Sequence, residues 1–397
     1  IAIQLIVLVA VLLEFFDSFY IFYAVSIILS SAAVIWILND NSNPAYKLAW
    51  IIPILIFPIF GGLFYLVFGR IRLNKNLKME MIASADRIGS VRSEDRAFEA
   101  LEAANPQAAR QSRYLSTNAQ SPLWDHTATE YLPTGEIAFE RLLGELKKAE
   151  RFIFLEYFII EEGVMWKAIL GVLSEKARQG LDVRVMYDDL GCSAKLPSGY
   201  NRRLEALGIK CAVFNPMKPY PSPNLNHRDH RKIAVIDGSV GFTGGLNLAD
   251  EYINKVERFG YWKDSAIMLK GDAVWSLTLM FLKIWSHMKG EEADHLRFKP
   301  VLEGIESDGF VQPFGDSPLD DEPVGENVYL NLMGQVKDYL YITTPYLILD
   351  NEMLTALALA AKSGVDVRII TPHIPDKWYV HAVTRANYKA LVDSGVR

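Results

Sequence analysis

An internal repeat constrains the fold of this 397-residue chain more than any other feature. The segment GLDVRVM at residues 180–186 recurs as GVDVRII at residues 364–370. A run rich in aromatic and aliphatic residues precedes each copy, at residues 152–158 and 339–346, and a helical pattern that ends in a glycine follows each. Strands that alternate with helices in this way indicate an α/β fold in which one unit is used twice.

The repeat divides the chain after residue 70 into three regions. Residues 71–130 are charged and alanine-rich and are predicted to be a connecting region, residues 131–309 a first lobe, and residues 310–397 an incomplete second lobe. An acidic loop at residues 316–326 marks the seam between the two lobes. For the first lobe, the spacing of apolar residues predicts a mixed sheet with strands that include residues 152–160, 183–187, 211–214 and 261–269, and with helices that include residues 166–178 and 273–288.

The densest group of reactive side chains is the pattern H-x-K-x4-D, formed by His230, Lys232 and Asp237. Mostly apolar residues lie within the pattern and predict a buried strand, on which residues two apart point to the same face. We therefore expect His230 and Lys232 to face one pocket. An imidazole acts as a nucleophile or as a general acid or base, and an ammonium group holds the negative oxygens of a phosphate.

The residues that follow the predicted strand add further groups suited to an anion. Asp237 begins an Asp-Gly turn into a second apolar run, which leads to Gly244, Gly245 and Asn247. The two glycines allow backbone amides to approach an anion closely, and the asparagine adds a side-chain donor. Glu156 stands in an otherwise apolar run, where a buried carboxylate either orients a catalytic histidine or forms an internal ion pair.

Taken together, these motifs resemble those of the phospholipase D superfamily, in which H-x-K-x4-D is followed by G-G-x-N. The continuation LADEY at residues 248–252 and the segments NPAYKLAW at residues 43–50 and FPIFGG at residues 57–62 resemble bacterial cardiolipin synthases in particular. The resemblance extends over nearly the whole chain. It implies a phospholipase D-like α-β-α sandwich lobe and the start of a second, repeated lobe.

The resemblance also implies a second H-x-K-x4-D motif in the second lobe. By comparison with the first copy, that motif is expected soon after Arg397. We therefore interpret the sequence as a fragment of a longer protein that is inactive by itself.

A cardiolipin synthase is a phosphatidyl transferase that joins two phosphatidylglycerol molecules, releases glycerol and passes through a phosphohistidine intermediate without a metal or other cofactor. Carried over to this chain, the resemblance makes His230 the nucleophile or the acid–base group, Lys232 and Asn247 phosphate ligands, and Asp237 a catalytic or a structural carboxylate. Three alternatives stay open: hydrolysis of phospholipids, transfer to another alcohol, and a non-catalytic scaffold.

The first 70 residues carry the strongest compositional signal. Residues 20–38 and 48–68 contain no charged side chain, and each run is long enough to cross a bilayer as a helix. The apolar run at residues 1–13 is shorter and is either a truncated first span or an interfacial segment. Four basic residues at positions 70–78 follow the second run, which places the remainder of the chain in the cytoplasm by the positive-inside rule.

Charge and cysteine content narrow the class of partner. The formal net charge is −6, whereas proteins that bind nucleic acid regardless of sequence are more often basic. The two cysteines, Cys192 and Cys211, form neither a disulfide framework nor a zinc pattern and fit a reducing compartment. With the resemblance, we expect phosphatidylglycerol and other membrane phospholipids as partners, no nucleic acid, and a multi-pass location in the bacterial plasma membrane.

Overall fold

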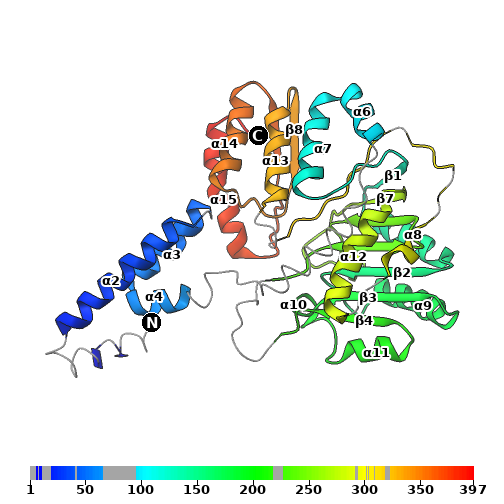
Figure 1. The fold of residues 1–397 in the computed structure, drawn as a ribbon, viewed down its shortest axis with the longest axis horizontal. Coiled ribbons are helices and arrows are strands. Elements are labelled where there is room, and N and C mark those ends of the chain that lie inside the picture. Colours follow the sequence, from blue (N-terminus) through cyan, green and yellow to red (C-terminus); the bar gives the residue numbers. More distant parts are fainter. Residues whose placement is uncertain are drawn as a thin grey trace. The chain divides into compact units, whose positions relative to one another are not determined.

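The computed structural model describes residues 6–7, 9–10, 19–40, 43–65, 95–217, 227–290, 294–300, 302, 304–307, 309–317 and 322–397. The described residues belong to two compact units, an amino-terminal helical unit and an α/β unit (Figure 1). The predicted basic cluster at residues 70–78 and most of the apolar run at residues 1–13 lie outside the described residues.

The amino-terminal unit contains helices α2 (Phe19–Leu38), α3 (Pro44–Ile56) and α4 (Pro58–Phe64). Helix α2 coincides with the first uncharged run. The second run was expected to form one helix, and this prediction is wrong because the chain breaks at Phe57 (φ −130°, ψ 76°). Pro58 lacks an amide hydrogen and disfavours helical geometry in the residue before it. Within the described chain, the helices do not reach the combination of length and apolarity that crossing a membrane requires.

Helices α3 and α4 pack closely against each other at Gly61. A Cβ atom at Gly61 of α4 would stand 2.6 Å from the carbonyl oxygen of Pro53 on α3, so no larger residue fits there. Ile37, Ile54 and Tyr65 form the centre of a small cluster among these helices. Many of the other large apolar side chains of this unit are exposed.

The α/β unit is built on a seven-stranded sheet in the order β1-β7-β6-β5-β2-β3-β4 (Figure 1). Its strands are β1 (Thr127–Leu132), β2 (Phe152–Tyr157), β3 (Asp182–Asp188), β4 (Lys210–Phe214), β5 (Lys232–Ile236), β6 (Val240–Gly244) and β7 (Ala266–Gly271). β2, β3 and β4 run parallel, and the remaining neighbours are antiparallel. The predicted mixed sheet is therefore confirmed.

Two differences from the predicted elements concern the edge of the sheet. β1 begins inside the region that was interpreted as a connection. β7 begins five residues later than expected, at Ala266, because the preceding loop is fixed by Asn254. The carboxamide of Asn254 accepts from the Trp262 amide at 2.7 Å and donates to the Trp262 carbonyl oxygen at 3.0 Å. These bonds hold a closed loop where the sequence pattern predicted a strand.

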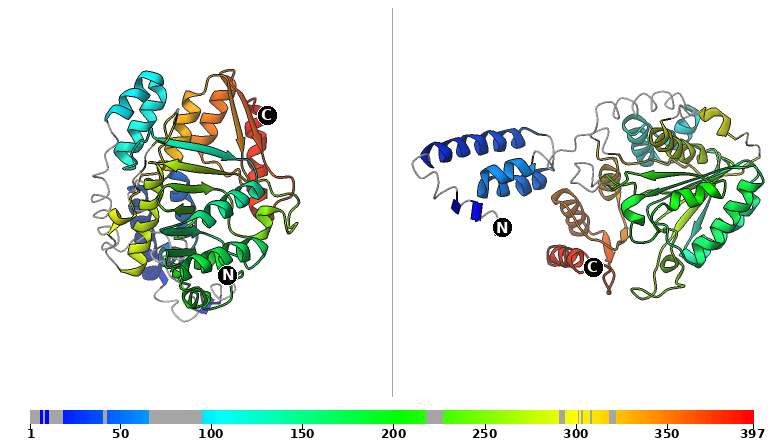
Figure 2. Two further views of the ribbon diagram at one scale, coloured as in Figure 1. Left: turned by 90° about the vertical axis from the view of Figure 1, so that its right-hand side faces the viewer. Right: turned by 90° about the horizontal axis from the view of Figure 1, so that it is seen from below.

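Helices cover both faces of the sheet (Figures 1 and 2). One face packs against α8 (Gly135–Lys148), α9 (Val164–Arg178) and α11 (Tyr200–Ala206), and the other against α12 (Val274–Lys289). The short helices are α10 (Asp189–Cys192), η4 (Asp250–Ile253) and η5 (His295–Phe298). The central strand β2 is buried along its whole length.

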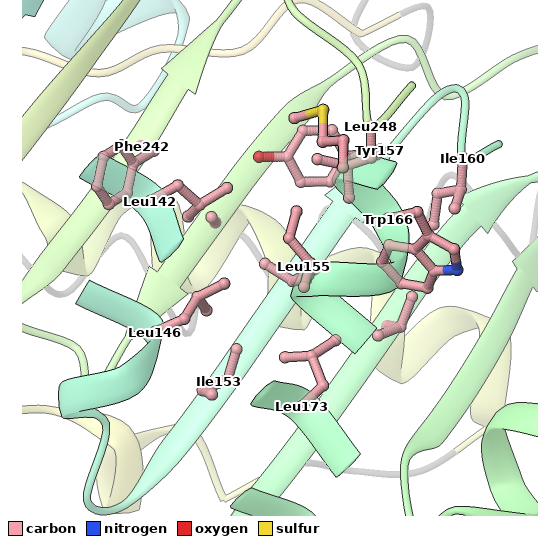
Figure 3. Close-up of a cluster of buried hydrophobic side chains, with 14 of the residues drawn as sticks. Leu142, Leu146, Ile153, Leu155, Tyr157, Ile160, Trp166, Leu173, Phe242 and Leu248 are labelled. Atoms are coloured by element: carbon pink, nitrogen blue, oxygen red, sulfur yellow. The ribbon is translucent and has the colours of Figure 1, made fainter. Parts of the chain in front are cut away.

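Figure 3 shows how the core on the first face is built. Ile153, Leu155 and Tyr157 alternate along β2 and point to the side of the sheet that α8 and α9 cover. The other labelled side chains of this core are Leu142, Leu146, Ile160, Trp166, Leu173, Phe242 and Leu248. A rigid layer of this kind fixes the end of β2, where the candidate site lies.

The second copy of the repeat forms a parallel pair of strands with its own helices. Its elements are α13 (Val324–Gln335), β8 (Tyr339–Thr343), α14 (Asn351–Lys362), β9 (Asp366–Ile370) and α15 (Trp378–Asp393), and α6 (Asp95–Ala104) and α7 (Pro106–Asn118) precede the first copy. β8 pairs with β9 in the register in which β2 pairs with β3. The predicted repeat is thus a repeat of structure.

Candidate active site

The H-x-K-x4-D motif lies on β5, at the centre of the sheet between β2 and β6. β5 begins at Lys232, which pairs with Tyr157 at the end of β2. His230 precedes the strand by two residues. The structure therefore brings both side chains to one end of the sheet, where the parallel strands β2 and β3 also end.

Phe158 connects the two motif side chains. Its ring lies 4.8 Å from the imidazole of His230 between ring centroids, at an interplanar angle of 59°. The Lys232 ammonium stands 5.6 Å from the centroid of the same ring and donates to the His230 carbonyl oxygen at 2.5 Å. One aromatic side chain thus contacts both the candidate nucleophile and its neighbouring cation. Sequence reasoning missed Phe158, which the apolar run of β2 concealed.

Electrostatics at this end of the sheet favour a neutral imidazole beside a cation. Burial, and next the positive charge of Lys232, lower the pKa of His230 below its usual range. Burial lowers the pKa of Lys232 to about 8, although the carboxylates of Asp229 and Asp264 act in the opposite direction. Near pH 7, His230 is therefore largely neutral and Lys232 largely charged. A neutral imidazole is the nucleophilic form, and the ammonium group attracts phosphate oxygens.

Asn247 is buried and already bound on both sides of its carboxamide. Its Oδ1 accepts from the amide of Ile159 at 3.0 Å, and its Nδ2 donates to the Tyr252 hydroxyl at 2.7 Å. An asparagine amide carries two hydrogens, so one remains for a ligand. Asn247 therefore braces the chain after β2 as well as offering one donor. Tyr252 was not singled out from the sequence.

Gly244 and Gly245 are explained by packing within the protein. A Cβ atom at Gly244 would stand 2.5 Å from the carbonyl oxygen of Ser265, and one at Gly245 would stand 2.4 Å from Oδ1 of Asp264. The amide of Gly245 also donates to the Ser265 carbonyl oxygen at 3.2 Å. The small size of these glycines admits the segment that leads into β7, and their predicted role in letting backbone amides approach an anion stays a prediction.

Asp264 is a member of the site that sequence reasoning missed. Its carboxylate accepts from the Ser265 amide at 2.8 Å and from the Trp262 indole at 3.3 Å. Burial raises the pKa of Asp264 above its usual range, although the hydrogen bonds from Ser265 and Trp262 and then the charge of Lys232 act in the opposite direction. The available sequence signal was a lone acid between aromatic residues and a buried strand. The negative charge of Asp264 and the positive charge of Lys232 thus stabilise each other.

Asp237 lies at the opposite end of β5, roughly 16 Å from Lys232 at 3.3 Å per residue. Its carboxylate accepts three backbone amides, from Glu150 at 2.8 Å, Arg151 at 2.8 Å and Phe152 at 2.9 Å. It also holds a positive φ of 54° in the turn between β5 and β6. These hydrogen bonds anchor the start of β2 and support a structural role for Asp237, whereas its catalytic role stays a prediction.

Glu156 forms the internal ion pair that was one of its two predicted roles. Its Oε1 lies 2.5 Å from the guanidinium of Arg231, whose Nε lies 3.2 Å from Oδ1 of Asp229. Burial raises the pKa of Glu156 well above its usual range, against the effect of Arg231. Asp229 in turn donates its amide to Asp188 at 3.1 Å. This network holds the segment on which His230 stands.

The sheet and the motif hairpin at its centre define a phospholipase D-like domain. A family model described as "Cardiolipin synthase, PLD-like domain" matches residues 142–268 and 329–397, and one described as "Phospholipase_D-nuclease N-terminal" matches residues 28–70. The chain is 37% identical to a cardiolipin synthase of Geobacillus kaustophilus over 93% of its own length and 75% of that protein. It belongs to the cardiolipin synthase family of phospholipase D-like proteins.

Two further relatives match over a similar part of the chain. An uncharacterized protein of Streptococcus mutans is 45% identical, with 92% of this chain and 79% of that protein covered. A cardiolipin synthase of Halalkalibacterium halodurans is 33% identical, with 90% of this chain and 72% of that protein covered. The resemblance inferred from the motifs is confirmed.

Proposed function

We propose that this protein makes cardiolipin by transferring a phosphatidyl group from one phosphatidylglycerol molecule to another, with release of glycerol. The observation that carries the proposal is the contact of His230 and Lys232 with one ring, that of Phe158, at the end of a rigid sheet. The relatives named cardiolipin synthase supply the substrate class. Phosphatidylglycerol fits because Lys232 offers a positive charge to its phosphodiester.

The proposed transfer has two halves. In the first, the imidazole of His230 bonds to phosphorus while the bond from phosphorus to the glycerol oxygen breaks, and that oxygen takes a proton from a second acid–base group. In the second, the hydroxyl oxygen of the acceptor attacks phosphorus, its proton passes to the same group, and the phosphorus–nitrogen bond breaks. We propose that the second group is the histidine of the second H-x-K-x4-D motif that the resemblance implies, and that the two histidines can exchange roles.

The positive charge in this mechanism comes from the protein. Lys232 faces the non-bridging oxygens, whose charge must be held throughout the transfer, and Asn247 adds one neutral donor. Phe158 limits the water around both His230 and Lys232, which strengthens their interaction with an anion. We propose that Glu156 and Arg231 act from the other face of the sheet by fixing the backbone before β5.

Product analysis tests this function. The intact protein, supplied with phosphatidylglycerol vesicles, is expected to form cardiolipin and glycerol in equal amounts. Phosphatidic acid as the main product would instead indicate hydrolysis. We expect His230→Ala to lower the rate of cardiolipin formation by about a thousandfold or more, because the nucleophile or acid–base group is lost. His287→Ala, on the exposed side of α12, is the matched control.

We also propose that residues 1–70 attach the protein to the bacterial plasma membrane in a multi-pass arrangement, with the α/β unit in the cytoplasm. The exposed apolar side chains of α2, such as Ile21, Ile28 and Leu29, support contact with lipid, since water would penalise such a surface. Extraction of membranes at alkaline pH and labelling of cysteines introduced at residues 39–40 and in the α/β unit test this proposal. Release of the protein by alkali would contradict it.

A further inference from the structure

Three polar side chains of the second copy gather in the loops that follow β8 and β9. The hydroxyl of Tyr346 donates to the carboxylate of Asp376, and the Lys377 ammonium lies 5.2 Å from the centroid of the Tyr346 ring. Backbone hydrogen bonds to two threonine side chains hold the loop that carries Tyr346. The amide of Tyr346 donates to Thr344 Oγ1 at 3.3 Å, and the next amide donates to Thr384 Oγ1, which is fully buried, at 3.0 Å. The group is therefore built before any ligand binds.

These side chains act on the residues of the candidate active site. Burial and Lys232 lower the pKa of His230, and the ammonium of Lys377 adds to the same effect. Burial raises the pKa of Tyr252 to about 12, and the carboxylate of Asp376 adds to that effect. Tyr252 is the residue whose hydroxyl holds Asn247. The charges of Lys377 and Asp376 in the second copy therefore shift the pKa values of His230 and Tyr252 in the first copy.

The same loop also comes close to the first lobe. Cδ1 of Ile374 stands 3.7 Å from the position that a Cβ atom at Gly260 would take. Gly260 has a positive φ of 84° and lies in the loop that leads to Asp264. The loop after β9 therefore lies beside the segment that carries the missed acid of the site.

The chemistry of the group fits one end of an alcohol substrate better than a phosphate. A carboxylate accepts several hydrogen bonds, of which Tyr346 uses one on Asp376, and vicinal hydroxyl groups donate such bonds. The same carboxylate repels a phosphate, so the donor phosphate is directed to Lys232. Lys377 is exposed and attracts an anion that approaches from outside.

We propose that Tyr346, Asp376 and Lys377 form the subsite for the acceptor, a polyol head group carried on an anionic lipid. The hydroxyl groups bind Asp376 and Tyr346, and the phosphodiester of the acceptor lipid binds Lys377. This inference rests on the proposed function. The subsite would explain why an alcohol, rather than water, accepts the phosphatidyl group in the second half of the reaction.

A partition experiment tests the subsite. The intact protein is given phosphatidylglycerol vesicles together with ethanol, so that cardiolipin and phosphatidylethanol form from the same phosphatidyl-enzyme. The ratio of the two products does not depend on the first half of the reaction. Asp376→Asn and Tyr346→Phe are expected to lower the ratio of cardiolipin to phosphatidylethanol, roughly tenfold or more for Asp376→Asn, because a hydrogen bond to a charged group is lost.

Lys377→Met separates the charge from the hydroxyl contacts. With free glycerol as competitor in place of ethanol, this variant is expected to shift products from cardiolipin toward phosphatidylglycerol re-formed with labelled glycerol, because glycerol lacks a phosphate. Asp393→Asn is the control, since its carboxylate is exposed on α15 and contacts Lys389. Its product ratio is expected to match that of the wild type.

The outcomes separate this inference from the proposed function. If the wild-type protein forms cardiolipin but all three variants keep its product ratio, or lose all products in parallel, the acceptor subsite is refuted. If the wild-type protein forms only phosphatidic acid, the proposed function fails first. Lys377 is on the surface, so the folded state of its variant is secure even if a substitution at Asp376 disturbs the loop.

Discussion

The two copies of the repeat share a sequence but differ in what covers them. In the first copy, Arg184 lies 5.1 Å from the ring of Phe154, which is fully buried. In the second, Arg368 lies 5.1 Å from the ring of Tyr341, which is 55% exposed. The local geometry of the strands is therefore the same, and burial is decided by α12, which covers only the first copy among the described elements.

The chemistry of the aromatic residues follows this difference. Phe154 stacks on Phe281 of α12 at 4.6 Å between ring centroids, where a hydroxyl would lack water. Tyr341 directs its hydroxyl to Asp366 at 2.9 Å, in a position that solvent reaches. The comparison shows that the repeat encodes a pair of strands, whereas helix α12, which packs over the first copy, determines which of their side chains are buried in the core.

Substitution of the equivalent aromatic residues should give the largest contrast. We expect Phe154→Ala to reduce the free energy of unfolding by about 3–5 kcal/mol, because it leaves a cavity beneath α12. Tyr341→Ala should reduce the free energy of unfolding far less, as surface substitutions do. Denaturant unfolding of both variants measures the difference. Equal losses would show that the second copy is covered as closely as the first.

Asp237 lies in the turn between β5 and β6, which has no counterpart among the described residues of the second copy, and its substitution tests what this turn contributes to stability. Asp237→Ala removes the acceptor of three backbone amides and is expected to destabilise the protein by about 3 kcal/mol. Asp237→Asn keeps one acceptor oxygen and tolerates the positive φ, so it should lose less. Thermal unfolding with parallel assays checks this order. A stable Asp237→Ala protein that has lost cardiolipin formation would support the catalytic role of Asp237.

Arg184 and Arg368 occupy equivalent positions in the two copies, and their substitutions should give a smaller difference in the free energy of unfolding. Arg184 is buried, pairs with Asp182 and contacts three aromatic rings, so Arg184→Ala should cost about 2 kcal/mol. The loss is limited because Lys210 and Arg297 also pair with Asp182. Arg368→Ala is expected to change the free energy of unfolding much less than Arg184→Ala, because exposed ion pairs contribute little. A larger effect at Arg368 would contradict the difference in burial.

The pH dependence of kcat/KM tests the smallest expected effect, the protonation of His230 and Lys232 in the first copy. Protonation of His230 removes the nucleophile, so activity should fall on the acid side below its lowered pKa. The pKa of Lys232 is about 8, and its charge is lost as the pH rises above that value. Activity should then fall about tenfold per pH unit. Lys232→Arg should remove this alkaline limb, and an unchanged limb would assign it to another group.

Much of the fold was predictable because its signals are local. The apolar runs around residues 153, 183 and 234 identified central strands, and the recurrence of the GLDVRVM segment identified the second copy. The break at Phe57 was also encoded in the sequence, because Pro58 disfavours helical geometry in the residue before it. The late start of β7 was not visible, since Asn254 closes its loop with a residue eight positions away.

The candidate site was predictable in part, for the same reason. His230 and Lys232 share a short motif, so their proximity follows from the period of a strand. Phe158 directly follows β2 and Asp264 lies in the loop before β7, and no spacing in the sequence records how close they come to His230 and Lys232. Gly244 and Gly245 were predicted to let backbone amides approach an anion, and their close approach to the segment at Asp264 is known only from the packing.

By itself, the sequence determined the family, the repeated α/β unit and the pair His230 and Lys232, because each depends on periodicity or on residues a few positions apart. Tertiary structure alone decided that Asp237 anchors β2, that Glu156 pairs with Arg231, and which side chains surround the imidazole. The physical reason is that burial and pairing depend on contacts between strands and helices distant in the chain. Such contacts set the desolvation and charge around each group, and the linear order of residues does not.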